Sequence, residues 1–197
     1  FRSGPITWGY PTWKLEPGKM PAETQKWLKY DQAEAKKLMD AAGVGSTEYL
    51  MHMYPYNADY TPESQLLIDS MKKIGLNLKL KVYDYNNWLA TAYIGKYNDT
   101  LYGPDNLDRL SQMLADRLLK GSSRNHSDVS DDASQKLLTD FASAKTPAEA
   151  KTHADALQVR SVDQAYAVYR PQPVTPHMWD AAIQNYGDKG EFAMYRS

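Results

Sequence analysis

The stretch that decides the fold runs from residue 48 to residue 83 and reads EYLMHMYPYNADYTPESQLLIDSMKKIGLNLKLKVY. Its first seven residues, 48–54, form the apolar run typical of a buried strand. Thr61-Pro62 then supplies a cap and a first-turn proline for a helix that ends at Gly75. Residues 76–83 alternate between apolar and polar, which predicts a half-buried strand. A strand–helix–strand unit of this kind implies a right-handed crossover between two parallel strands.

The same reading extends in both directions from this unit. Upstream, Asp31 caps a helix to about Ala42, and Gly43 supplies its left-handed end. On the inner side of the helix in 61–75 we expect Leu66, Leu67, Ser70, Met71 and Ile74. Further helices and strands follow downstream: a helix over 86–94, a strand over 98–102, and helices over 107–119, 132–144 and 147–162, the last with a Thr146–Glu149 capping box. The expected fold class is α/β, with a small mixed sheet flanked by helices.

Composition excludes several classes of function. The 197 residues carry a formal net charge of -1, so no basic field attracts nucleic acid, and we expect no nucleic-acid partner. There is no Cys, which excludes disulfides and thiolate metal sites. The four His, at 52, 126, 153 and 177, match no zinc-binding spacing. No phosphate-binding Gly loop or nucleophile elbow is present. We therefore expect no metal, no cofactor and no catalytic residue.

A resemblance to a known family comes from several phrases in unbroken order. Residues 30–43, YDQAEAKKLMDAAG, resemble the Y-D-x-x-x-A-x-x-L-L-x-x-A-G helix of family 5 extracellular solute-binding proteins, which serve peptide- and nickel-type ABC importers. The phrase QLLIDSMKKIGL at 65–76 is similar to that family's helix-to-strand junction. NWL at 87–89 with GKYND at 95–99, SRNHS at 123–127 with Asp131-Asp132, and the helix over 148–164 continue the match. The resemblance covers about residues 28–180.

The resemblance implies two α/β lobes that are joined by a hinge and close on a ligand. This chain matches the C-terminal lobe of such a periplasmic-binding-protein-like fold. We expect an extended N-terminal arm over 1–29, a ligand-binding lobe over 30–175, and a segment over 176–197 that returns toward a missing first lobe. The implied partners are a peptide or similar solute, an ABC permease and that missing lobe. The implied location is periplasmic or extracellular, with a lipid anchor on the full-length protein as one option.

Binding residues implied by the family follow the third strand, where a cleft carboxylate meets the ligand's amino group. Here the corresponding stretch is YGPDNLD at 102–108, so Asp105 is the first candidate and Asp108 the second, with Tyr102 and Asn106 beside them. Family members have Gly-Trp where this chain has Gly103-Pro104, so the usual aromatic ring is absent. The alternative is that Asp105 or Asn106 simply caps the next helix.

Two further pairs come from the residues themselves. Tyr83 and Tyr85 follow a strand at its C-terminal end, where open α/β sheets bind ligands. In the loop at 123–127, Arg124 is suited to pair with a carboxylate, with Asn125 beside it. A solvated loop arginine is the alternative interpretation. For Trp88 we expect packing of its helix on the sheet rather than ligand stacking.

Two other functions remain open from the sequence. The content of 15 Tyr and 5 Trp also suits a carbohydrate-active hydrolase, whose two carboxylates can be far apart in sequence. A non-catalytic interaction domain is the other alternative. If the chain is half of a two-lobed binder, the isolated 197 residues should bind ligand weakly or not at all.

Overall fold

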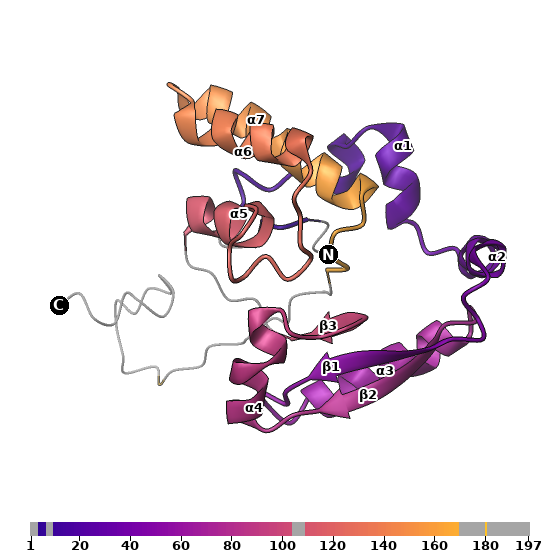
Figure 1. Ribbon diagram of the computed structural model, residues 1–197. Helices are drawn as coiled ribbons and strands as arrows, with labels where there is room; N and C mark the ends of the chain where they lie inside the picture. The colour runs from indigo at the N-terminus through magenta and orange to yellow at the C-terminus, as the bar shows by residue number, and fades with distance from the viewer. Residues whose placement is uncertain (1–3, 7–9, 104–108, 170–179, 181–197) are drawn as a thin grey trace.

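The sheet is small and parallel. The computed structural model describes residues 4–6, 10–103, 109–169 and 180. Strand β1 (Glu48–Met53) lies between β2 (Asn77–Val82) and β3 (Thr100–Tyr102), and both neighbours run parallel to it (Figure 1). The parallel pairing of the first two strands is confirmed. The antiparallel strand that a mixed sheet requires is not among the described residues.

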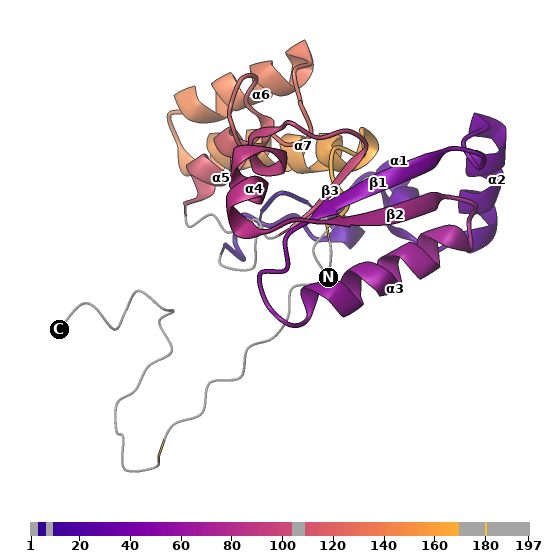
Figure 2. The same cartoon turned by 60° about the horizontal axis from the view of Figure 1, so that its bottom comes forward.

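Helix α3 (Tyr60–Lys72) covers one face of this sheet (Figure 2). In β1 the side chains of Met51 and Met53 are buried. The predicted start of α3 at Thr61 is wrong, because the helix begins at Tyr60, whose ring is only 4% exposed and belongs to the core. The predicted burial of Leu66 is wrong as well, since that side chain is 69% exposed. Burying Tyr60 and Ser64 turns Leu66 outward.

Helix α2 (Gln32–Ala42) has the ends that the sequence predicts. The Asp31 carboxylate accepts a hydrogen bond from the Glu34 N–H at 2.9 Å, and Gly43 ends the helix with a φ of 67°. None of its residues is buried, however, and Leu38 on its apolar side is 48% exposed. Figure 1 shows α2 set apart at the end of the sheet.

The predicted helix over 86–94 is divided in two. Helix α4 (Tyr85–Ala90) is capped by Asp84, and the 3₁₀ turn η3 (Ala92–Ile94) follows it and ends at Gly95 with a φ of 84°. Thr91, at φ -130° and ψ -86°, separates them because neither angle fits a helix.

A group of three helices lies on the other side of the sheet from α3 (Figure 2): α5 (Leu110–Leu118), α6 (Asp132–Ser143) and α7 (Pro147–Asp163). Its buried core consists of Ile6, Leu114, Leu118, Val129, Leu138, Ala154 and Leu157. At the start of α7 the Glu149 N–H donates to Thr146 Oγ1 at 3.1 Å. The Glu149 carboxylate accepts from the Lys145 N–H at 2.8 Å, one residue before the predicted capping-box partner. None of the described helices has the length and apolar content to cross a membrane.

The described part of the N-terminal arm lies against this helical group. It contains three short turns, η1 (Pro17–Lys19), α1 (Ala22–Gln25) and η2 (Lys26–Leu28). Gln158 of α7 holds the arm by accepting from the Leu15 N–H at 2.9 Å and donating to the Trp13 carbonyl at 3.0 Å. The irregular, Pro-rich arm therefore packs against α7. The domain boundaries at 29 and 175 stay predictions.

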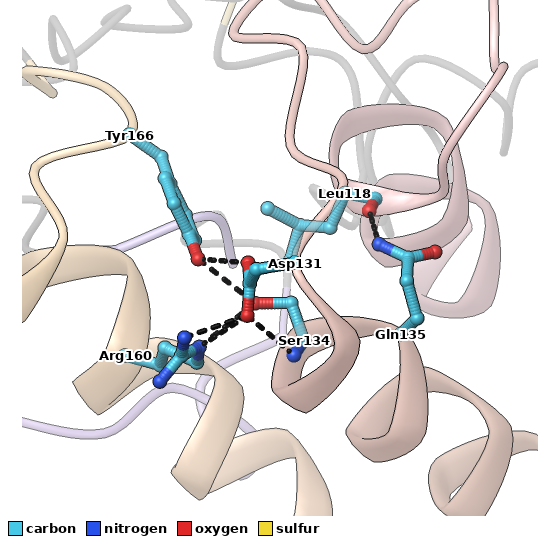
Figure 3. A network of polar contacts seen from close by, with 6 residues as sticks. All are labelled: Leu118, Asp131, Ser134, Gln135, Arg160 and Tyr166. Atoms are coloured by element: carbon cyan, nitrogen blue, oxygen red, sulfur yellow. Dashed lines mark hydrogen bonds and ion pairs between the residues drawn. The ribbon is translucent and has the colours of Figure 1, made fainter.

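A polar network fastens the ends of α6 and α7 (Figure 3). Asp131, the N-cap of α6, accepts from the Ser134 N–H at 3.0 Å and from Arg160 Nη2 at 2.6 Å, and Arg160 Nε donates to the same oxygen at 3.0 Å. The Tyr166 hydroxyl donates to the other carboxylate oxygen. Beside it, Gln135 Nε2 donates to the Leu118 carbonyl at 2.8 Å, which ties α5 to α6. One carboxylate therefore fixes the chain where it leaves α7.

Candidate ligand-binding site

Aromatic side chains gather where the parallel strands end. Because the three strands point the same way, their C-terminal ends meet at one edge of the sheet. The segments after β1 and β2, the first residue of α3, helix α4 and the last residue of β3 each contribute rings. We call this group the aromatic edge, and its members are Tyr54, Tyr56, Tyr60, Tyr83, Tyr85, Trp88 and Tyr102.

Trp88 is the buried centre of the aromatic edge. It is 1% exposed, and its indole Nε1–H donates to the Tyr56 hydroxyl at 2.9 Å. The rings of Tyr83 and Tyr56 contact it edge-on, with centroids 6.0 and 6.4 Å away. A Cβ at Gly103 would lie 3.4 Å from the indole, in van der Waals contact, so the chain after β3 passes close to the ring. Trp88 packs α4 on the sheet, as the sequence predicts.

The rings open to solvent lie next to Trp88. Tyr85 is 51% exposed and Tyr56 is 38% exposed. Tyr54 lies between them, with centroid distances of 5.3 Å to Tyr85 and 4.8 Å to Tyr56. Partial burial raises the pKa of Tyr56 above its usual value, so its hydroxyl stays protonated. These rings offer apolar faces together with hydroxyl groups, a combination common at binding surfaces.

Carboxylates flank the exposed rings. The Tyr102 hydroxyl donates to Glu63 Oε2 at 2.7 Å, and the Tyr102 ring contacts Tyr60 with a centroid distance of 5.7 Å. Asp84, the N-cap of α4, accepts from the Asn87 N–H at 3.0 Å, and this hydrogen bond lowers the pKa of the Asp84 carboxyl. The site therefore presents acceptors suited to a ligand's N–H or ammonium groups.

A histidine lies beneath this edge on the central strand. His52 is 3% exposed, and its Nδ1 lies 2.7 Å from the Tyr83 hydroxyl. Its ring stacks on Tyr83 with centroids 5.7 Å apart and contacts Tyr97 at 5.8 Å. Burial is the main reason why the pKa of His52 is lowered, with Lys81 adding to the effect. His52 is therefore neutral at pH 7.

The structure brings together three of the predicted residues, Tyr83, Tyr85 and Tyr102. Asp105 and Asn106, and Asp108 behind them, lie outside the described residues. Their proposed contact with a ligand amino group stays a prediction.

Arg124 and Asn125 make their contacts within their own loop and with α5. Arg124 Nη1 lies 3.8 Å from Asp116 Oδ2, and its N–H donates to Ser122. Asn125 accepts from the Val129 N–H at 2.9 Å and donates to the Val129 carbonyl at 2.8 Å. Asn125 also lines a polar hollow of about 620 Å³ between this loop and the segment 94–99. These contacts explain the loop's shape, and a ligand role for the pair stays a prediction.

Five members of the site were not predicted from the sequence: Tyr54, Tyr56, Tyr60, Glu63 and His52. The signal for two of them was available, because Tyr54-Pro55-Tyr56 follows β1 as Tyr83-Asp84-Tyr85 follows β2. The same rule about strand ends applies to both. Tyr60 was hidden by the incorrect helix start, and His52 by its place inside an apolar strand.

Known proteins resemble this chain in sequence and in fold. No family model matches the chain. Di/tripeptide-binding protein 3 of Pseudomonas aeruginosa is 28% identical over 86 residues, which cover 41% of this chain. The match spans only 16% of that relative's length.

Two solved structures show the same fold. The oligopeptide-binding protein AppA of Bacillus subtilis, in complex with a nonapeptide, superposes with a TM-score of 0.65 at 14% identity over 83% of this chain and 34% of its own. The dipeptide-binding protein of Pseudoalteromonas sp. SM9913, in complex with Met-Leu, gives 0.57 at 21% identity over 70% of this chain and 29% of its own. Sequence match and fold together confirm the resemblance: the chain carries part of the fold of the family 5 extracellular solute-binding proteins.

Proposed function

We propose that this chain is the ligand-binding lobe of an extracellular solute-binding protein, and that the aromatic edge is its part of the site for a peptide or similar solute. The observation that carries the proposal is the meeting of three parallel strand ends at one group of tyrosines, two of them open to solvent. The names of the relatives support the ligand class, because they bind dipeptides and tripeptides.

The chemistry of the aromatic edge suits an extended peptide. The faces of Tyr56 and Tyr85 would pack against its side chains and Cα groups, and their hydroxyls would bond to its backbone. Glu63 and Asp84 would favour an ammonium group over a carboxylate. Such a ligand would not be transformed, so the role we propose is capture and not catalysis.

The rest of the proposal concerns partners. The aromatic edge is one wall, and we infer that a second lobe supplies the opposite wall and closes over the ligand. The closed form would then deliver the bound solute, on the outer side of the membrane, to an ABC permease. The matched structures are about three times as long as the part that this chain covers, which leaves room for such a lobe.

The test is calorimetric titration of the full-length protein with Met-Leu and a set of defined dipeptides and tripeptides. Tyr85→Ala removes a ring that is 51% exposed, and we expect affinity to fall about 5- to 30-fold, the cost of one aromatic contact of about 1–2 kcal/mol. Tyr30→Ala is the matched control, because Tyr30 is 91% exposed and lies before α2. Equal affinities for the two variants, or no heat with any peptide, would refute the proposal.

A further inference from the structure

We propose that Trp88 is a positioning residue: its indole N–H directs the Tyr56 hydroxyl so that this hydroxyl donates its hydrogen bond to a carbonyl oxygen of the ligand. The inference rests on the proposed function and deepens it, because it names a group that recognises the backbone of a peptide. The hydrogen bond between Trp88 and Tyr56 itself exists without a ligand.

The direction of this hydrogen bond follows from the chemistry of the two groups. An indole N–H can only donate, so in the 2.9 Å contact between Trp88 Nε1 and Tyr56 the hydroxyl oxygen is the acceptor. Two hydrogens directed at the same side of one oxygen repel each other, so the Tyr56 O–H turns away from the indole. Burial raises the pKa of Tyr56 above its usual value, and the hydroxyl therefore keeps its proton at neutral pH. Tyr56 is thus left as a donor with a defined direction.

The Tyr56 hydroxyl proton has no acceptor among the residues that the structure describes. Trp88 is 1% exposed, whereas Tyr56 is 38% exposed, so the pair reaches from the core to the surface. Without a ligand the hydroxyl donates to water. A ligand oxygen can replace that water with a hydrogen bond of its own.

The Tyr56 ring is held in place before a ligand arrives. Its N–H donates to the Tyr54 carbonyl at 3.0 Å, which closes a tight turn around Pro55, and the proline ring fixes φ at the centre of this turn. The ring contacts Tyr54, Tyr60 and Trp88, with centroid distances of 4.8, 5.6 and 6.4 Å. A donor fixed in this way binds with a smaller loss of conformational entropy.

The charges beside the aromatic edge decide which ligand oxygen suits Tyr56. Glu63 accepts from the Tyr102 hydroxyl at 2.7 Å. The Tyr102 ring contacts Tyr60, which in turn contacts Tyr56. On the other side of the exposed rings, Asp84 is the N-cap of α4. These carboxylates would repel a ligand carboxylate, so a neutral amide carbonyl is the acceptor we expect at Tyr56.

The first test examines the hydrogen bond in the full-length protein without ligand. The Trp88 indole N–H resonance, identified by its loss in Trp88→Phe, should move to higher field and exchange faster in Tyr56→Phe, because its acceptor is gone. It should be unchanged in the control Tyr30→Phe, whose side chain is 91% exposed and lies outside the aromatic edge. An indole resonance that does not respond to Tyr56→Phe would overturn the proposal.

The second test is calorimetric titration of the full-length protein with Met-Leu and with its thioamide analogue, in which sulfur replaces the amide oxygen. Sulfur is the weaker acceptor, so the wild type should bind Met-Leu about fivefold more tightly than the analogue, the effect of one hydrogen bond. Tyr30→Phe should keep this ratio. In Tyr56→Phe the affinity for Met-Leu should fall about fivefold, and the two ligands should bind equally.

Trp88→Phe separates positioning from packing. It keeps the Tyr56 hydroxyl but removes the group that directs it, so the ratio between the two ligands should fall toward one. If Trp88 only packed α4 on the sheet, both affinities would fall together and the ratio would keep its wild-type value, which would disprove the positioning role. If peptides bind and Tyr56→Phe keeps the wild-type ratio, the inference is wrong while the proposed function stands. If no peptide binds, the proposed function fails and the inference fails with it.

Discussion

Replacing Asp131 by Asn should destabilise the protein by about 2 kcal/mol at pH 7. The carboxylate accepts from the Ser134 N–H, from two nitrogens of Arg160 and from the Tyr166 hydroxyl. Asn is as good an N-cap as Asp, so the cap is kept, and the loss comes from the hydrogen bonds to the charged group, each of which contributes about 1.5–3 kcal/mol. The side chains of Asp131 and Arg160 are 34% and 30% exposed, so solvent screening reduces the ionic part to about 2 kcal/mol.

Urea unfolding followed by tryptophan fluorescence measures this loss, and the melting temperature should drop by roughly 4–8 °C. Asp132→Asn is the control, because Asp132 is the exposed neighbour in the first turn of α6, and it should change stability by less than about 0.5 kcal/mol. The reasoning is refuted if the two variants lose equal stability.

The same variant has a defined pH signature. The hydrogen bonds hold the pKa of Asp131 well below its usual range, so the folded state binds the proton less readily than the unfolded one. This contribution is complete above the unfolded pKa of about 3.9 and is lost as the pH falls below it. Asp131→Asn should therefore flatten the acid side of the stability curve.

Two further predictions concern the helical group. Gln158→Leu should lower the free energy of unfolding by about 2 kcal/mol, because the Gln158 side chain holds the arm at Leu15 and Trp13. Hydrogen exchange at the Leu15 amide should become faster. Unchanged exchange at that amide would show that the arm does not depend on Gln158. Thr146→Ala should cost about 1 kcal/mol in a thermal melt through loss of the cap on α7, and Thr152→Ala, an exposed change within the same helix, should cost much less.

Local signals in the sequence located both ends of α2 and the approximate positions of the three described strands. Asp31 and Gly43 bound α2 as expected, because a cap and a left-handed glycine act within a few residues. The strand–helix–strand unit was equally predictable from alternation and a short connection. Periodicity does not tell which surface covers an apolar face. Leu66 is therefore exposed although it lies on a predicted inner side, and Leu38 is exposed although it lies on the apolar side of α2.

The candidate site was predicted only in part, for the same reason. Tyr83 and Tyr85 were found because their position after a strand has a general meaning. Trp88 was assigned correctly to packing. The role of His52 depends on contacts with Tyr83 and Tyr97, residues 31 and 45 positions further along the chain, and no local pattern records such a pairing.

The outer strands of the small sheet also influence how the protein behaves at high concentration. In the described sheet β2 is an edge strand, and its outward side chains Lys79 and Lys81 are exposed. The other edge, β3, is only three residues long. Charged and short edges discourage a strand of another molecule from adding to the sheet. Lys81, whose Nζ lies 5.2 Å from the centre of the Tyr83 ring, therefore also helps to protect the sheet from aggregation. An apolar residue at position 81 would remove that protection.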